Sequence, residues 1–303
     1  MSPQALNNLI MRLIDEGKLP ITMWPSDVSA EHFGLSEASG YYRWRSPVAL
    51  LEPAAIDSAL NLEALKIFHV VGSTNTELMA TAAKGVVNRF LYSAECQIQG
   101  RGRRGRAWTS PFARNLAFSY GHVTPVPLNK LGGLSLVVGL AVAESINSRS
   151  SVDASLKWPN DLVVGEQKLG GILVELMPSG NSTQIIVGVG VNVSLQEADR
   201  ADVERQITDL HSIGNNHSRT EELIEIVSTL QQFLARFDEQ GFEPFVEAFN
   251  AAHIYHGKTC AIHQGDQIII GEVDGVAPDG ALILYTDSGL RSFHGGEVSL
   301  RPN

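Results

Sequence analysis

Residues 168–193 read KLGGILVELMPSGNSTQIIVGVGVNV. This stretch contains two apolar runs, at 171–176 and 184–193, which we interpret as strands joined by a Gly-containing turn. Runs of the same kind occur at 67–71, 88–96 and 115–120. Between the runs, 52–65 and 220–239 have helical patterns, and 131–149 looks like a buried helix because it is aliphatic and rich in small residues. Strands mixed with helices in this way predict one central α/β-type domain.

The two ends of the chain have different patterns. Ser2 and Pro3 are typical of a helix start, and the helical spacing continues to residue 16, whereas 18–48 look irregular. After residue 253, short alternating runs at 259–263, 267–276, 281–286 and 289–294 are separated by Gly- and Asp-containing turns. Such a series predicts a small β-barrel. We therefore expect three units, at 1–50, 51–253 and 254–303.

Composition excludes several classes of protein. The 303 residues are 44% hydrophobic and 18% charged, which is ordinary for a globular chain. A net charge of −10 is unfavourable for a protein whose main role is to hold nucleic acid. Cys96 and Cys260 are too few and too far apart for a disulfide framework or a Cys-based zinc site. We find no secretion signal or membrane span, so we expect a cytoplasmic protein.

Charge is distributed unevenly along the chain. No acidic residue occurs between Glu95 and Glu144, and four of the arginines in this stretch lie in the sequence GRGRRGR at 100–106. Glycine lets the backbone approach a ligand closely, and guanidinium groups bind phosphate or carboxylate oxygens in pairs. A mobile loop that orders around an anion and an ordinary solvated loop both fit this composition.

The same loop matches the dinucleotide-binding pattern GxGxxG, but we reject that interpretation. The pattern should open a helix and be followed by an acidic residue about 20 positions later. Here Pro111 and the strand-like run at 115–120 follow, and the next acidic residue is Glu144. The phosphate-binding pattern GxxxxGK[ST] is also absent from the sequence.

Polar residues gather in four further places, each with an ordinary structural explanation. KWPND at 157–161 fits a strand-to-turn transition, and STN at 73–75 fits a helix N-cap. Lys168 precedes a glycine pair, where a lysine is usually solvated but can also reach an anion. Asn192 ends an apolar strand. None of these clusters decides the function alone.

Together these segments resemble the bacterial biotin–protein ligase family, of the bifunctional ligase/repressor type. The matching stretches are GSTN at 72–75, AECQ at 94–97, GRGRRGR at 100–106 with Trp108, KWPND at 157–161, KLGGILVE at 168–175 and GVGVN at 188–192. The resemblance covers about residues 50–303, and GGEVSL at 295–300 looks like the end of the family's C-terminal barrel. It implies an α+β fold, with a central mixed sheet flanked by helices as in class II aminoacyl-tRNA synthetases and biotin ligases, and a C-terminal SH3-like β-barrel.

The resemblance implies an ATP-dependent biotin–[biotin carboxyl carrier protein] ligase. Such an enzyme joins its substrates biotin and ATP to give biotinyl-5′-adenylate and pyrophosphate. It then transfers the biotinyl group to one lysine of the biotin carboxyl carrier protein of acetyl-CoA carboxylase. Both reactants of the first step are anions, so cationic donors must offset their repulsion. Mg²⁺ is expected with ATP, and no residue is assigned as a metal ligand.

The resemblance also implies roles for individual residues. Arg103 and Lys168 are the predicted catalytic residues. The predicted biotin-binding residues are Ser73, Thr74, Asn75, Gln97, Arg101, Gly102, Arg103 and Lys168. The predicted nucleotide-binding residues are Trp108, Asn160, Asp161 and Asn192, and the Asn160–Asp161 pair is also a candidate for positioning magnesium or the acceptor lysine.

The N-terminus departs from the family pattern. Residues 1–13 resemble the recognition helix of a winged helix-turn-helix without the two helices before it, and 41–52 resemble the linker that follows. Residues 1–40 carry a net charge of −3, whereas elements that read DNA are cationic. We therefore expect operator DNA to bind poorly or not at all. Loss of repressor function and a start codon assigned too late both explain this N-terminus.

Two other functions remain open. A lipoate–protein ligase shares the catalytic fold, but the Arg-rich loop followed by Trp108, together with KWPND, favours biotin. The second alternative is a DNA-binding repressor of biotin synthesis that responds to biotinyl-adenylate. The intact Arg loop and Lys168 favour retained catalysis instead. Relatives often form homodimers, and no feature of this sequence decides whether this chain does.

Overall fold

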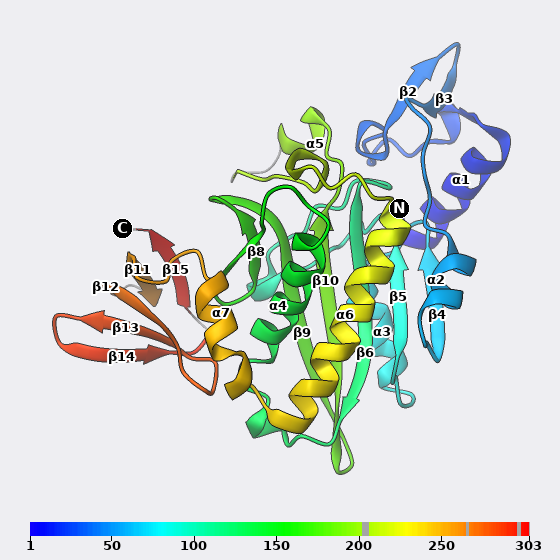
Figure 1. Ribbon diagram of the computed structural model, residues 1–303. Coiled ribbons are helices and arrows are strands. Elements are labelled where there is room, and N and C mark those ends of the chain that lie inside the picture. Colours follow the sequence, from blue (N-terminus) through cyan, green and yellow to red (C-terminus); the bar gives the residue numbers. More distant parts are fainter. Residues whose placement is uncertain (202–205, 265–266, 296–297, 303) are drawn as a thin grey trace.

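The computed structural model describes residues 1–201, 206–264, 267–295 and 298–302. Its centre is a seven-stranded sheet with the order β4-β5-β6-β10-β9-β8-β7 (Figure 1). The strands β4 and β5 run parallel, and the other neighbouring pairs are antiparallel, so the predicted mixed sheet is confirmed. The strands are β4 (Ala64–Phe68), β5 (Phe90–Ala94), β6 (Asn115–Thr124), β7 (Ser155–Lys157), β8 (Asp161–Val164), β9 (Gln167–Ser179) and β10 (Ser182–Asn192).

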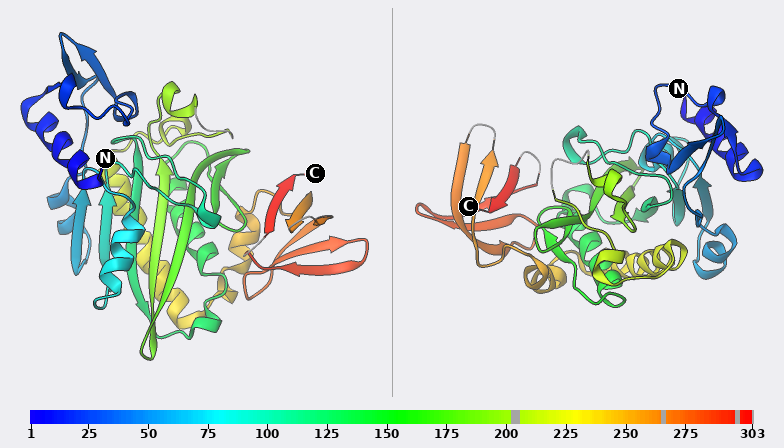
Figure 2. Two further views of the ribbon diagram at one scale, coloured as in Figure 1. Left: turned by 180° about the vertical axis from the view of Figure 1, so that it is seen from behind. Right: turned by 90° about the horizontal axis from the view of Figure 1, so that it is seen from above.

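Helices pack on both faces of this sheet. The helices α4 (Leu134–Asn147) and α6 (Arg219–Gln240) cover one face, and α3 (Thr74–Ala82) lies on the other (Figures 1 and 2). Almost all of α4 is buried, which explains why its sequence is apolar on every side. The helix α6 begins with a capping box of Ser218 and Glu221 and buries one apolar face. The described residues contain no helix long and apolar enough to cross a membrane.

The N-terminal segment forms a small module at one end of the sheet. The predicted helix at 2–16 is confirmed as α1 (Pro3–Glu16), with Ser2 as its N-cap and Gly17 as its C-cap. The prediction that 18–48 is irregular is wrong, because β1 (Leu19–Pro20), β2 (Leu35–Ala38) and β3 (Tyr41–Trp44) form a three-stranded sheet. Ser39 and Gly40 both have positive φ, which is the geometry of a tight hairpin turn between β2 and β3.

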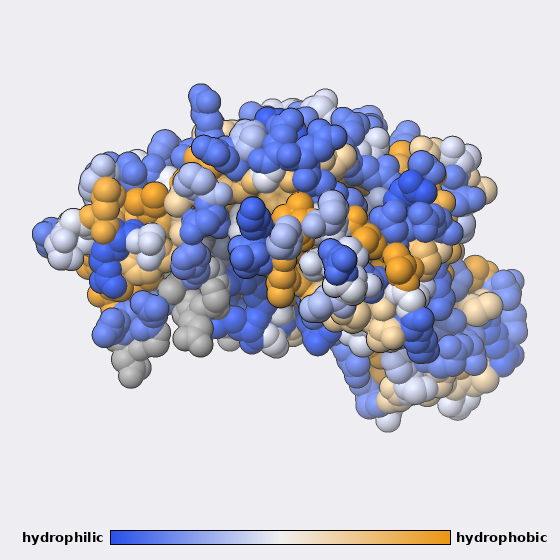
Figure 3. All heavy atoms as spheres, turned by 90° about the horizontal axis from the view of Figure 1, so that it is seen from below, coloured by the Kyte–Doolittle hydropathy of each residue, from blue (hydrophilic) through white to orange (hydrophobic). Residues whose placement is uncertain are grey.

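The C-terminal segment lies at the opposite end (Figure 1). It is a five-stranded antiparallel sheet in the order β14-β13-β12-β11-β15, consistent with the expected SH3-like barrel. The strands are β11 (Thr259–Gln264), β12 (Gln267–Val276), β13 (Leu282–Thr286), β14 (Gly289–Phe293) and β15 (Val298–Pro302). Of the predicted 295–300 motif, Gly296 and Glu297 lie outside the described residues. Seen from below, the molecular surface is mostly hydrophilic, with apolar side chains scattered across it (Figure 3).

Some predicted element bounds are wrong. The helix predicted at 52–65 ends early, because α2 spans Pro53–Ala59 and β4 begins at Ala64. The strand predicted at 67–71 is therefore shifted towards the N-terminus. The structure also adds α7 (Val246–Ala252), which connects the central sheet to the barrel, and α5 (Glu197–Ala201), which follows β10.

Candidate active site

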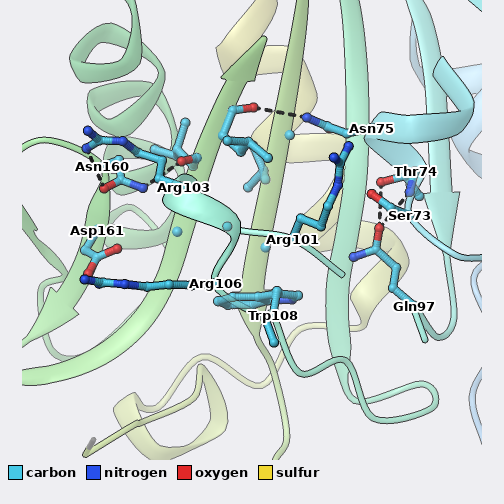
Figure 4. Close-up of a pocket in the computed structure, with 18 of the residues that line it drawn as sticks. Ser73, Thr74, Asn75, Gln97, Arg101, Arg103, Arg106, Trp108, Asn160 and Asp161 are labelled. Carbon is cyan, nitrogen blue, oxygen red and sulfur yellow. Dashed lines mark hydrogen bonds between the residues drawn. The ribbon is translucent and has the colours of Figure 1, made fainter. Parts of the chain in front are cut away.

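A pocket of about 730 Å³, partly open to solvent, lies between the start of α3, the loop at 100–108 and the strands β9 and β10 (Figure 4). Every predicted site residue except Asn192 lines it. These residues come from segments that are as much as a hundred positions apart in the sequence. The antiparallel pairing of β6, β10 and β9 brings these segments together.

One end of the pocket is a hydrogen-bonded cluster around the start of α3. Thr74 donates both its backbone N–H and its hydroxyl to Gln97 Oε1, at 2.7 and 3.0 Å. Ser119 Oγ lies 2.8 Å from Thr74 Oγ1 and donates to Asn75 Oδ1 at 2.5 Å. Gln97 Oε1 is therefore already engaged, which leaves the Nε2 group of Gln97 to face a ligand. Ser73 and Gln97 point toward the same space in Figure 4.

Asn75 is held by protein groups on both sides of its amide. Its Nδ2 group donates to Glu175 Oε2 at 2.8 Å and to the carbonyl oxygen of Leu173 at 3.4 Å. Gly188, which pairs with Leu173 and Ser119 in the sheet, lies directly beneath: a Cβ atom there would approach Asn75 Oδ1 to 2.4 Å. The amide of Asn75 thus joins α3 to three adjacent strands.

The loop at 100–106 forms the cationic wall of the pocket. Arg101, Arg103 and Arg106 line the pocket, whereas Arg104 does not. Arg101 donates to Thr76 Oγ1 at 3.0 Å, and Arg103 donates to Asn160 Oδ1 at 3.3 Å. Burial lowers the pKa of Arg103, and the carboxylate of Asp161 partly offsets this effect. The guanidinium group stays charged, because its ordinary pKa is far above neutral pH.

Lys168 lies at the boundary between this pocket and a smaller neighbour. Its Nζ atom is 2.5 Å from Asp161 Oδ1 and 5.7 Å from the centre of the Trp108 ring. The second pocket is lined by Trp108, Lys168 and Asn192, together with Ala107, Thr109, Pro111, Leu195, Asp199 and Ile207. Two cavities therefore share one lysine and one aromatic side chain.

Trp108 and Asn192 shape the second pocket in different ways. The Trp108 ring packs on Gly190, where a Cβ atom would come within 2.6 Å of the ring. Within the described residues its buried Nε1 group has no hydrogen-bond partner. Asn192 is buried and donates to the carbonyl oxygen of Thr208 at 2.9 Å, which fixes the end of β10. The two glycines in GVGVN thus allow close contacts with Asn75 and Trp108.

The structure also identifies residues that the sequence did not single out. Arg106 lines the pocket, and its place in the Arg-rich loop was a usable signal. Ser119 and Glu175 both contact Asn75: nothing in the sequence marked Ser119, and Glu175 ends the KLGGILVE stretch but was given no role there. Arg114 belongs to the same cationic stretch but lines neither pocket, and it forms a buried ion pair at 2.6 Å with Asp199, which borders the smaller one.

Comparison with known proteins places these features in a family. Residues 67–192 match the biotin/lipoate A/B protein ligase family, and residues 255–301 match the biotin protein ligase C-terminal domain. The bifunctional ligase/repressor BirA of Salmonella typhimurium is 31% identical over 99% of this chain and 90% of its own length. The biotin–[acetyl-CoA-carboxylase] ligase of Paracoccus denitrificans is 31% identical over 75% of this chain and 96% of its own length.

Solved structures agree. The biotin protein ligase from Aquifex aeolicus in complex with biotin and ATP matches with a TM-score of 0.70 and 30% identity, covering 80% of this chain and 100% of that chain. The family resemblance inferred from the sequence motifs is therefore confirmed. This chain belongs to the biotin/lipoate A/B protein ligase family and, within it, to the biotin protein ligases.

Proposed function

We propose that this ligase makes biotinyl-5′-AMP in the paired pockets and then transfers biotin to a carrier protein. In the first step a carboxylate oxygen of biotin attacks the α-phosphorus of ATP, a carboxyl–phosphate bond forms, and pyrophosphate leaves. In the second step a lysine amine of the acceptor attacks the carbonyl carbon. An amide forms, AMP leaves and one proton is released.

The meeting of two pockets at Lys168 and Trp108 is the observation that carries this proposal. We place biotin in the larger pocket, with its polar head at Ser73, Thr74 and Gln97, and the adenine against Trp108 and Asn192 in the smaller one. The reacting carboxylate and α-phosphate would then meet beside Lys168. A cation at that point stabilises the charge that develops between two anions.

Arg101, Gly102 and Arg103 would cover the reacting groups. Arg103 is already oriented by Asn160, whose Nδ2 group donates to the carbonyl oxygen of Ile172 at 2.8 Å. A loop ordered over the adenylate excludes water, which would otherwise hydrolyse the mixed anhydride. We assign Asn75 a positioning role beside biotin, since its amide is engaged by Ser119 and Glu175.

Magnesium enters this scheme as part of the substrate MgATP. The described residues contain no group of three or more His, Cys, Asp or Glu side chains that could hold a metal ion. Mg²⁺ commonly binds one or two carboxylates together with substrate phosphates and water, and Asp161 in the pocket wall suits that arrangement. Asp161 is equally placed to attract the ammonium group of an acceptor lysine.

We propose the biotin carboxyl carrier protein of acetyl-CoA carboxylase as the acceptor, because similar proteins are named as ligases of that enzyme. We expect the reaction in the cytoplasm, where ATP is available. The two cysteines of the protein, Cys96 and Cys260, are free and buried, which suits a reducing compartment. We also expect a homodimer. We expect no tight binding to operator DNA. The ligase/repressor name of the Salmonella relative makes DNA binding the alternative to test.

Mass spectrometry of an acceptor domain incubated with this protein, biotin and MgATP tests the proposal. The expected product is one biotin per acceptor on a single lysine, formed together with AMP and pyrophosphate. Lipoate supplied in equal amount should not compete. An unmodified acceptor, or a lipoylated one, would contradict the assignment.

A further inference from the structure

The pocket carries more positive than negative charge, and its cations have acidic partners at two places. At one end Lys168 lies 2.5 Å from Asp161. At the other end Arg101 Nη2 lies 3.9 Å from Glu175 Oε1. Both pairs must rearrange when an anionic substrate enters, because Lys168 and Arg101 face the same cavity. Asp161 belongs to the motif already discussed, whereas Glu175 has no assigned role.

Glu175 is placed to act on Arg101 from outside the pocket. It lies on β9, two residues beyond Leu173, and it does not line the cavity itself. Its Oε2 atom accepts from Asn75 Nδ2 at 2.8 Å, which orients the carboxylate and leaves Oε1 on the side of Arg101. Thr76 accepts from the same Arg101 nitrogen at 3.0 Å. Arg101 is thus drawn toward the start of α3 by two groups.

We propose that Glu175 is a positioning residue: it holds Arg101 at the start of α3 before biotin binds, and Arg101 leaves it to turn toward the carboxylate of biotin beside Lys168 when the loop closes. This inference rests on the proposed function. Because Glu175 and the ligand carboxylate compete for one guanidinium group, Glu175 lowers the affinity for biotin while it keeps the loop at 100–106 ordered. Asn75 links this exchange to the biotin-binding end of the pocket.

Glu175→Gln is the informative variant. The amide oxygen of glutamine still accepts from Asn75, so the change removes the charge and keeps the hydrogen bond. We expect biotin to bind roughly two- to fivefold more tightly at low salt, the range for a partly exposed ion pair, since the Arg101 and Glu175 side chains are 49% and 29% exposed. The gain should shrink in 1 M salt, where screening acts over about 3 Å.

A second measurement needs no ligand. Trypsin cleaves after arginine, and the loop at 100–106 contains four arginines, so limited digestion followed by mass spectrometry reports how well the loop is held. Without biotin, Glu175→Gln should be cut in this loop faster than the unchanged protein. With biotin and MgATP, the two proteins should be equally protected.

Two controls isolate the contact. Glu63→Gln removes a more exposed carboxylate that pairs with Arg89 at 3.0 Å, away from the pocket, and should change neither measurement. In an Arg101→Ala background, Glu175→Gln should have no effect on biotin affinity, because the partner of the charge is gone.

Unchanged or weaker biotin binding by Glu175→Gln would overturn the inference, and so would equal digestion of the loop. Calorimetry of biotin with the unchanged protein distinguishes a failure of this inference from a failure of the proposed function. If that titration shows no binding, biotin is not the ligand. In that case, limited trypsin digestion without ligand still tests the contact between Glu175 and Arg101.

Discussion

Lys168 lines two pockets because of the residues that follow it in β9. Gly170 and Gly171 follow it in β9, and a Cβ atom at Gly171 would come within 3.0 Å of Nζ, so glycine leaves room for the side chain to fold back along the strand toward Asp161. The sequence showed a lysine beside two glycines and therefore allowed an anion-binding role. It could not show that Trp108 would lie on the other side of the same ammonium group, since that contact depends on the tertiary fold.

Arg103→Ala and Lys168→Ala should each lower the rate of adenylate formation by about 10²–10³, the usual effect of removing a donor that stabilises developing charge. Biotin-dependent exchange of pyrophosphate into ATP measures this rate. Arg104→Ala is the matched control, because Arg104 belongs to the same loop but does not line the pocket. Near-normal exchange and adenylate lifetime in both variants would refute these roles.

Gly190→Ala should weaken ATP binding, because the added methyl group would come within 2.6 Å of the Trp108 ring and displace it. Stacking of a base on an aromatic ring is worth roughly 1–3 kcal/mol, so the KM for ATP should rise about tenfold. Gly85→Ala, at a position with open space around it, is the control. An unchanged KM for ATP would contradict the stacking role.

Long apolar patterns in the sequence predicted helices and strands correctly, whereas short patterns did not. The caps of α1 and α6 and the apolar run of β10 are local signals, and these elements form where expected. The hairpin of β2 and β3 was missed although Ser39 and Gly40 mark its turn, because four-residue strands show little alternation. KWPND fits a strand-to-turn transition, and β7 does end at Lys157. The extents of β7 and of β8 beyond the turn were not predicted, since these short strands are defined by pairing with each other and with β9.

The junction between α7 and the barrel contains a buried histidine with a testable consequence. His253 is 4% exposed, and neither ring nitrogen has a hydrogen-bond partner within the described residues. Burial, and then the nearby His256 and Lys157, lower its pKa from 6.5 to about 3. Below pH 6.5 the unfolded chain therefore binds a proton that the folded chain does not, and the free energy of unfolding falls with pH down to about 3.

This histidine alone should lower the free energy of unfolding by about 2 kcal/mol at pH 5 relative to pH 7.5. Urea denaturation at the two pH values measures the difference. His253→Phe should remove most of it, because phenylalanine suits the neighbouring Phe249 and Tyr255 rings and carries no titratable group. His294→Gln, at a side chain that is 72% exposed, should keep it. Equal pH dependence in all three proteins would show that His253 is not responsible.

At the scale of the whole molecule, the sequence motifs identified the family and almost all of the pocket, but not how the parts support one another. The N-terminal module packs on the catalytic part, where Asn7 of α1 accepts from the backbone N–H of Val70 at 3.1 Å and Trp44 stacks on Phe112. No local pattern in residues 1–48 predicted these contacts. The limits of the three units, at 50/51 and 253/254, stay predictions.

The same packing supports a negative prediction about DNA. The apolar face of α1 is buried through Leu6, Ile10 and Leu13, and its exposed Arg12 pairs with Glu16 at 2.6 Å. Little unpaired positive charge is left to contact phosphates. In a gel-shift assay with DNA from upstream of biotin-synthesis genes, this 303-residue chain should give no sequence-specific complex, with or without biotinyl-5′-AMP. A tight, salt-sensitive complex would establish the repressor alternative.

Trp108 lines both cavities, and this limits how the biotin pocket can be redesigned. Trimming Trp108 to admit a bulkier vitamin analogue would also widen the adjoining cavity, because both are lined by that ring. Variants selected for enlarged analogues should therefore avoid this position and instead alter side chains that border the larger cavity alone, such as Leu173 or Phe118.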